Sequence, residues 1–157
     1  MGASQPQSMR VVLDANIYMS ALINSKGIPS KIVQEGLSKR FENLISVDTF
    51  KEISRVVNYP KIRQPYNIDE RKVQKFLLQI KQQSVFITPQ KTVPIIKDES
   101  DNRYLECAEA GKAEVIVSGD KHFLNLKHYK KIRIENPASF WEMLKKNKGG
   151  IWTSDDS

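Results

Sequence analysis

The sequence predicts a three-layer α/β/α sandwich around a central, mainly parallel five-stranded sheet. Short apolar runs alternate with longer segments whose apolar residues recur at helical spacing, which is typical of strands joined by crossover helices. Most of these runs do not alternate with polar residues, as expected for strands covered on both faces. The chain of 157 residues is also long enough for one domain with its own core, and it contains no internal repeat.

Each expected element follows from one of these two patterns. Strands are expected where apolar runs occur, at residues 9–14, 44–47, 84–88, 114–117 and 132–134. Helices are expected where apolar residues lie on one helical face, at residues 17–23, 29–37, 49–59, 69–83, 102–110 and 137–144. Strands and helices therefore alternate through most of the chain, and the connections between parallel strands are expected to be right-handed crossovers.

Polar residues at the helix starts support these limits. Asp48 or Thr49 is expected to cap the third helix and Asp69 the fourth, because their side chains can accept bonds from the first backbone N–H groups. Asn136 followed by Pro137 opens the last helix, since proline is favoured at the first helical position.

The bulk properties bound the domain and the type of protein. Residues 1–8 have no periodic pattern and are expected to be a non-native leader; residues 9–144 form the domain, and 145–157 a flexible tail. No stretch approaches the roughly 18 apolar residues of a membrane span, and no signal peptide is recognisable, so a cytoplasmic location is expected. Cys107, the only cysteine, is expected to be a small core residue.

The net charge of +7 favours a polyanionic partner, most often nucleic acid. A general solubility charge is the other explanation of this excess.

Four acidic residues are expected at one edge of the sheet. In such a fold each helix runs antiparallel to its strands, so helix starts lie on the same edge as the carboxyl ends of the strands. Asp14 ends the first strand, and Asp120 follows the fourth. Glu52 is expected in the first turn of the third helix, and Asp101 at the start of the fifth.

Taken singly, each of these residues has another explanation. Asp14, Asn16 or Asp101 can cap a helix. Asp120 can belong to a turn, and Glu52 can be a solvated residue favoured by the helix dipole. Together, however, two carboxylates about 4 Å apart repel by about 4 kcal/mol at an effective dielectric near 20.

A divalent cation removes that repulsion, and ligands that are all oxygen select a hard ion such as Mg²⁺ or Mn²⁺. A metal centre of this kind beneath a basic surface suits cleavage of a nucleic-acid strand, because the ion activates water while cationic side chains hold phosphates.

Four motifs occur in order along the chain: Val-Val-Leu-Asp14-Ala-Asn16, Phe-Lys-Glu52-Ile, Lys-Asp98-Glu-Ser-Asp101-Asn-Arg-Tyr-Leu-Glu-Cys-Ala and Val-Ser118-Gly-Asp120-Lys-His-Phe. In this combination they resemble the PIN-domain family over residues 9–144. The segment Ile-Glu-Asn-Pro-Ala-Ser-Phe resembles the last strand and helix of one bacterial group, the toxin components (VapC-like ribonucleases) of toxin–antitoxin systems.

The resemblance implies a sheet order of 3-2-1-4-5 and an endoribonuclease that depends on Mg²⁺ or Mn²⁺. It also implies an RNA substrate, a homodimer and inhibition by a cognate antitoxin protein. The implied catalytic and metal-binding residues are Asp14, Glu52, Asp101 and Asp120. Asn16 and Ser118 would support them, and Asp98 can share or replace part of the role of Asp101.

Candidate substrate contacts lie in two places. Lys121 and His122 follow Asp120 closely enough to contact a phosphate, although His122 is more simply a surface residue. The basic and aromatic connection at 61–67, with Lys61 and Arg63, is either a loop that binds RNA, a loop that faces a dimer partner or a plain solvated loop.

Three rival functions stay open at this point. A non-catalytic module that binds RNA or protein has no reason to keep four repelling carboxylates. A structure-specific DNA nuclease typically has more acids and extra helical arches. A phosphatase using Asp14 as nucleophile would usually have a second aspartate two residues later, where this chain has Asn16.

Overall fold

The computed structural model describes residues 8–90, 92 and 99–146. Helices and strands alternate along it as follows: β1 (Arg10–Leu13), α1 (Ala15–Ile23), α2 (Ile28–Leu37), β2 (Glu42–Ile45), α3 (Val47–Val57), α4 (Pro60–Arg63), α5 (Glu70–Gln83), β3 (Val85–Phe86), α6 (Glu99–Ala110), β4 (Val115–Val117), α7 (Lys121–Leu124), β5 (His128–Tyr129), β6 (Ile132–Glu135) and α8 (Pro137–Lys146). None of the described helices is long and apolar enough to cross a membrane.

The described strands form one sheet in the order β3-β2-β1-β4-β6-β5. All neighbours are parallel except β5 and β6, which form an antiparallel pair at one edge. The predicted order is therefore confirmed, with β6 as the expected fifth strand. The extra strand β5 is only two residues long, too short for a periodic signal in the sequence.

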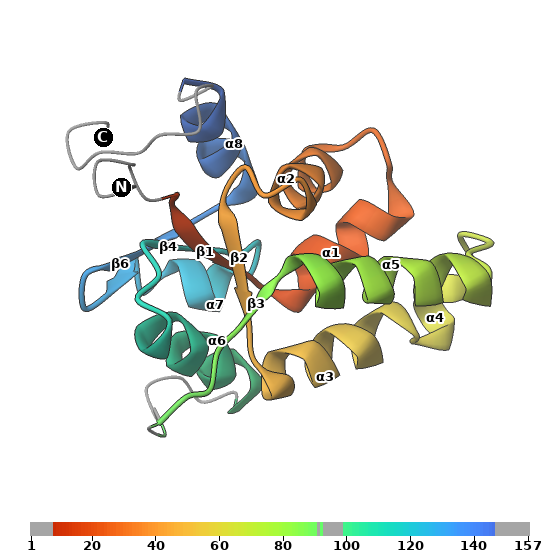
Figure 1. Cartoon of the computed structure of the whole chain (residues 1–157). Coiled ribbons are helices and arrows are strands. Elements are labelled where there is room, and N and C mark those ends of the chain that lie inside the picture. Colours follow the sequence, from red (N-terminus) through yellow and green to blue (C-terminus); the bar gives the residue numbers. More distant parts are fainter. Residues whose placement is uncertain (1–7, 91, 93–98, 147–157) are drawn as a thin grey trace, which may run out of the picture.

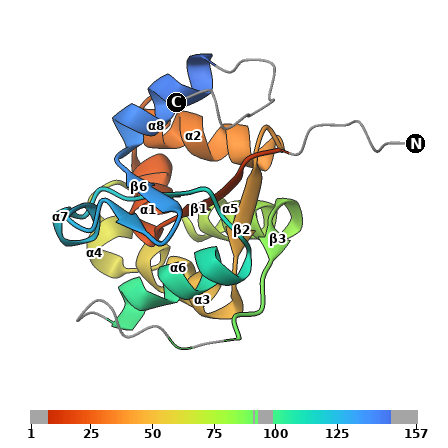
Figure 2. The ribbon, with the colours of Figure 1, turned by 90° about the vertical axis from the view of Figure 1, so that its left-hand side faces the viewer.

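Helices cover both faces of this sheet, so the predicted three layers are confirmed. Figure 2 shows α2 and α8 on one face and α3 and α6 on the other, while α4 and α5 extend away from β6 in Figure 1. The core runs through all layers and includes fully buried residues such as Val12, Ile32, Ile53, Leu105 and Phe140. Cys107 is buried as predicted.

The junction between β2 and α3 differs from the prediction. The strand ends at Ile45, and Ser46, not Asp48 or Thr49, caps the helix. The Ser46 hydroxyl accepts the Thr49 N–H at 3.1 Å, while the Thr49 hydroxyl accepts the Ser46 N–H at 2.8 Å. This reciprocal capping box starts the helix at Val47, an exposed residue whose apolar side chain made it resemble a strand residue. Glu52 consequently lies in the second turn of α3, not in the first.

Two other helix starts also come earlier than predicted. Asp14 caps α1, which begins at Ala15, and α6 begins at Glu99. Asp101 is therefore the third residue of α6 and not its cap. The caps predicted at Asp69 and Asn136 are confirmed by bonds to the N–H groups three residues later.

The remaining differences concern short elements. The connection predicted to be irregular contains the helix α4, and the predicted strand at 84–88 is reduced to β3. The short helix α7 was not predicted. The last helix, α8, continues through Lys146, two residues beyond its predicted end.

Candidate active site

Asp14 is a buried carboxylate at the carboxyl end of a central strand. Its N–H donates to the Val117 carbonyl of β4 at 3.1 Å, which extends the pairing of β1 with β4 by one bond. Its side chain accepts the N–H of Ile17 at 3.2 Å, so it caps α1, and only 4% of its surface is exposed. The chain therefore changes from strand β1 to helix α1 at Asp14.

Ser118 and Asp120 lie beside it because β1 and β4 end in register. Leu13 pairs with Val117, so Ser118 follows β4 at the level where Asp14 follows β1. The Ser118 hydroxyl accepts the N–H of Asp120 at 3.0 Å, and its interaction with the Asp14 carboxylate stabilises the ionised form of that acid. Asp120 in turn accepts the N–H of His122 at 2.8 Å and caps α7. One buried serine thus lies between the Asp14 side chain and the backbone of Asp120, at the ends of two neighbouring strands.

The charge on Asp14 is only partly compensated. Burial raises the pKa of Asp14 to about 6, and repulsion from Asp120 adds to this effect. The Ser118 hydroxyl and the N–H groups of Ile17 and Asn16 act in the opposite direction because they stabilise the ionised form. No Lys, Arg or His among the described residues forms an ion pair with Asp14. A cation bound here would relieve the cost of the buried charge.

Tyr104 of α6 closes the site from another layer. Its buried hydroxyl accepts the N–H of Ala15 at 3.0 Å, satisfying a backbone donor at the start of α1. Burial raises the pKa of Tyr104, and the negative charges of Asp14 and Glu52 raise it further. In the sequence, Tyr104 lies in the predicted helix 102–110, and the available signal was its position one turn after Asp101 with a polar group at the ring tip.

Glu52 is held differently. Both of its carboxylate oxygens accept hydrogen bonds from the Arg55 guanidinium, at 3.0 and 2.8 Å, and form a bidentate ion pair on α3. Its negative charge contributes to the raised pKa of Tyr104. The negative charge of Glu52 is nevertheless already neutralised by Arg55, a residue that the motifs in the sequence did not indicate.

The other acidic candidates are less well placed. Asp101 is half-buried in the first turn of α6, and Asp98 lies outside the described residues. Within residues 8–90, 92 and 99–146, no three His, Cys, Asp or Glu side chains are grouped in a way that would hold a metal ion. The structure therefore brings together Asp14 and Asp120, but it does not gather all four predicted carboxylates around one point.

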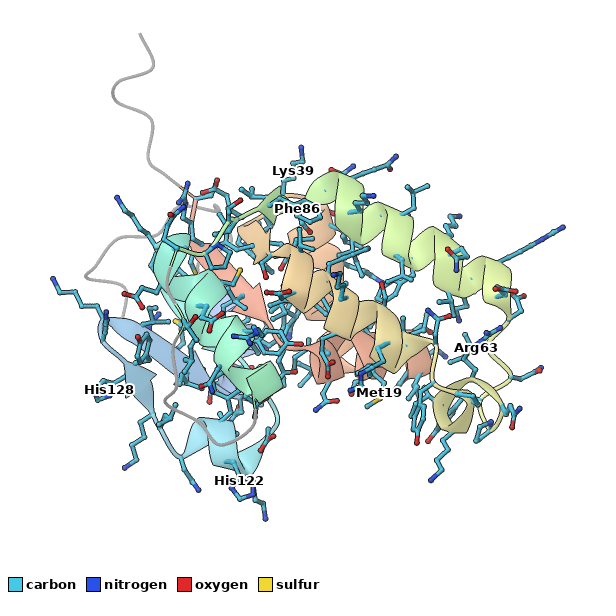
Figure 3. All side chains as sticks on the ribbon, turned by 90° about the horizontal axis from the view of Figure 1, so that it is seen from below. Met19, Lys39, Arg63, Phe86, His122 and His128 are labelled. Carbon is cyan, nitrogen blue, oxygen red and sulfur yellow. The ribbon has the colours of Figure 1, made fainter. Side chains whose placement is uncertain are left out.

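The remaining predicted residues lie around this centre. Asn16 is an exposed residue in the first turn of α1. Lys121 and His122 are exposed on α7, next to Asp120, whereas Lys61 and Arg63 belong to α4, beyond the far end of α3. Figure 3 shows His122 and Arg63 at opposite ends of one face, with Met19 between them.

Comparison with known proteins agrees with the order of these motifs. Residues 10–122 match the family model of the PIN domain. The chain belongs to the PIN-domain family. It is also similar to an uncharacterized protein of Methanocaldococcus jannaschii, with 32% identity over 146 residues that cover 88% of this chain and 93% of the relative. PIN domains are generally nucleases that use divalent metals, so the fold described above is a nuclease-type fold.

The donor atoms of this PIN domain suit a divalent ion chemically. Asp14, Asp120 and Ser118 supply only hard oxygen atoms, and Asp14 lacks a cationic partner within the described chain. Among the predicted carboxylates that the structure describes, the third would have to be Glu52 or Asp101, while Asp98 lies outside the described residues. For Glu52, that means leaving the bidentate contact with Arg55.

Proposed function

We propose that this PIN domain is an endoribonuclease that depends on Mg²⁺ or Mn²⁺, with its site at the ends of β1 and β4. The observation that supports this most strongly is the buried Asp14 carboxylate, which has Asp120 beside it and an elevated pKa. A fold that keeps an uncompensated charge in its interior loses stability, so its retention favours a role in binding a cation.

The residues have distinct parts in this proposal. Asp14 and Asp120 would hold the ion, and Glu52 and Asp101 would complete its ligands. Ser118 would support both aspartates, because its hydroxyl accepts the backbone N–H of Asp120 and stabilises the charge on Asp14. The bound ion would supply positive charge that activates water and stabilises the phosphate in the transition state. Lys121 and His122, which are exposed beside Asp120, would contact a phosphate of the substrate.

The proposal includes a biological setting. The motif order resembles that of toxin-like PIN proteins, which supports a homodimer in the cytoplasm that a cognate antitoxin protein inhibits. Co-purification with a protein encoded beside it, together with loss of RNA cleavage in that complex, would test this part.

A second function is favoured by one specific observation. Glu52 is already neutralised by Arg55, and the described carboxylates do not form a group of three. A non-catalytic PIN module that binds RNA or protein would have no need of a complete metal centre.

Cleavage of a mixed-sequence single-stranded RNA, beside a DNA of the same sequence, separates the two functions when it is measured in Mg²⁺, Mn²⁺ and EDTA. We expect RNA cleavage by the wild type only with metal. Asp14→Asn and Asp120→Asn should each slow it by about 100-fold or more, because a bound ion contributes several kcal/mol to the transition state.

Glu142→Gln is the matched control, since it removes an exposed carboxylate from α8, which covers the face of the sheet opposite to α3 and α6. Cleavage that survives in EDTA, or in both aspartate variants, would contradict the proposed nuclease. Tight RNA binding without cleavage in any metal would favour the binding module instead.

A further inference from the structure

A line of side chains, half-buried at Glu52 and exposed at Arg55 and Tyr59, leads away from the candidate site along α3. Glu52, Arg55 and Tyr59 are three and four residues apart, so they follow one side of the helix and its end. Glu52 raises the pKa of Arg55 through its hydrogen bonds and its charge, and Tyr104 and Tyr59 add smaller contributions. Arg55 is therefore tied to the candidate site by its two hydrogen bonds to Glu52.

This line ends at a polar pocket of about 450 Å³. Its walls come from the end of α3, from α4 and from the turn before α5, and comprise Asn58, Pro60, Arg63, Gln64, Asn67 and Ile68. The guanidinium of Arg63 is anchored through Nε, which donates to the Ile68 carbonyl at 3.4 Å. No acidic side chain in the described part of the chain pairs with Arg63, so its charge is available to an anion.

Two exposed tyrosines are sequence neighbours of residues that line this pocket. Tyr59 is 46% exposed and Tyr66 is 55% exposed, and the exposed Lys61 lies between them in sequence. Aromatic rings beside uncompensated cations are typical of surfaces that bind single strands, because bases stack on the rings while phosphates pair with the cations. The polar lining of the pocket favours this partner over another protein, whose buried interface core would be depleted in charged residues.

We propose that Arg55, Tyr59, Lys61, Arg63 and Tyr66, here called the α3–α4 track, bind single-stranded RNA on one side of the phosphate that is cleaved. This inference rests on the proposed nuclease function. Arg55, which pairs with Glu52, connects the track to the candidate site. Tyr59 and Tyr66 stack on unpaired bases, and Lys61 and Arg63 contact the phosphate backbone of the RNA. A duplex keeps its bases stacked inside, so it cannot use the two rings in this way.

RNA binding in EDTA tests the track separately from cleavage. Fluorescence anisotropy of a labelled 12-nucleotide single strand should show affinity reduced by about 5- to 100-fold in Tyr59→Ala. Tyr59→Phe keeps the ring and should bind as the wild type does. Arg63→Gln should reduce the slope of log affinity against log salt by about one, as expected for one lost phosphate contact.

The controls match these changes on a different surface. Leu78→Ala removes a side chain of similar exposure from α5, and Lys81→Gln removes an exposed cation from the same helix. Both should leave the affinity unchanged. Duplex RNA of the same sequence should be insensitive to Tyr59→Ala.

Unchanged affinity in the track variants, or equal weakening in the α5 controls, would overturn the inference. A second result would also overturn it: Tyr59→Ala binds RNA as the wild type does but sediments with a lower molecular mass than the wild type. The surface would then be a contact between copies of the chain.

Cleavage by the wild type, measured in parallel, separates the two proposals. Binding that depends on the track without any cleavage would support the track and contradict the nuclease. Cleavage with unchanged affinity in the variants would contradict only the track.

Discussion

Asp14 and Glu52 were predicted as members of one acidic set, yet the fold holds them in opposite ways. Asp14 is buried at a strand end, capped by backbone N–H groups and a serine, and has no cationic partner in the described chain. Glu52 is on a helix surface, and Arg55 binds both of its oxygens.

In the proposed nuclease, this difference would separate a carboxylate prepared for a metal, Asp14, from one in a resting contact, Glu52. A buried acid without a counter-charge reduces stability at neutral pH, whereas a solvated ion pair contributes little in either direction. Metal binding would therefore be driven mainly from Asp14, and Glu52 would join after it exchanges Arg55 for the ion.

The largest effect on stability is expected from Asp14→Asn in buffer with EDTA. Asparagine keeps the cap of α1 but removes the charge. Because the folded pKa is raised to about 6, the wild type loses stability as the pH rises from about 4 through about 6. The variant should be more stable by about 3 kcal/mol at pH 8 and no different at pH 4.

Urea unfolding at the two pH values measures this difference directly. A gain that is equal at pH 4 and pH 8 would show that Asp14 is not the source of the buried charge.

Ser118→Ala should have the next largest effect. It removes a hydroxyl that stabilises the ionised Asp14 carboxylate, and a hydrogen bond to a charged group contributes about 1.5–3 kcal/mol. The loss should be greater at pH 8 than at pH 4, because Asp14 is ionised only at the higher value. Ser139→Ala, an exposed serine of α8, is the control, and a loss independent of pH would break the link to Asp14.

Tyr104→Phe should reduce stability by about 1–2 kcal/mol at both pH values. The ring stays in place, but the buried N–H of Ala15 loses its acceptor. The pKa of Tyr104 is raised, so its hydroxyl stays protonated throughout this range. A strong pH dependence in this variant would contradict the distinction drawn between Tyr104 and Ser118.

Glu52→Gln should have the smallest effect on folding. Its partner Arg55 is exposed, and solvent screens the pair. The urea midpoint should match that of the wild type, and 0.5 M salt should not separate them. A marked loss of stability would mean that the pair is structural, which would argue against its exchange for a metal.

The sequence predicted the ends of the strands well, but it did not predict the positions of all the side chains. Asp14 and Asp120 were correctly located because each closely follows an apolar run whose register β1 and β4 share. Glu52 was placed one turn too early, because Val47 looked like the end of a strand while Ser46 and Thr49 form the cap.

The parts that the sequence did not reveal depend on contacts between elements. Tyr104 sits in an apolar stripe, and only the packing of α6 against the start of α1 turns its hydroxyl into a site residue. The pair of Glu52 with Arg55 is compatible with spacing of three residues, but such spacing alone does not indicate which charges meet. The strand β5 arises from an edge hairpin that is too short for periodicity.

Thermal unfolding of the wild type and Asp14→Asn across a Mn²⁺ titration at pH 7.5 tests the central claim most directly. Binding to the folded state should stabilise the wild type by about 2.7 kcal/mol when the ion is at 100 times its Kd, with a corresponding rise in Tm. Asp14→Asn should begin with a higher Tm in EDTA and show no rise with Mn²⁺. An equal rise in both proteins, or none in the wild type, would contradict the assignment of Asp14 as the buried carboxylate that binds the metal.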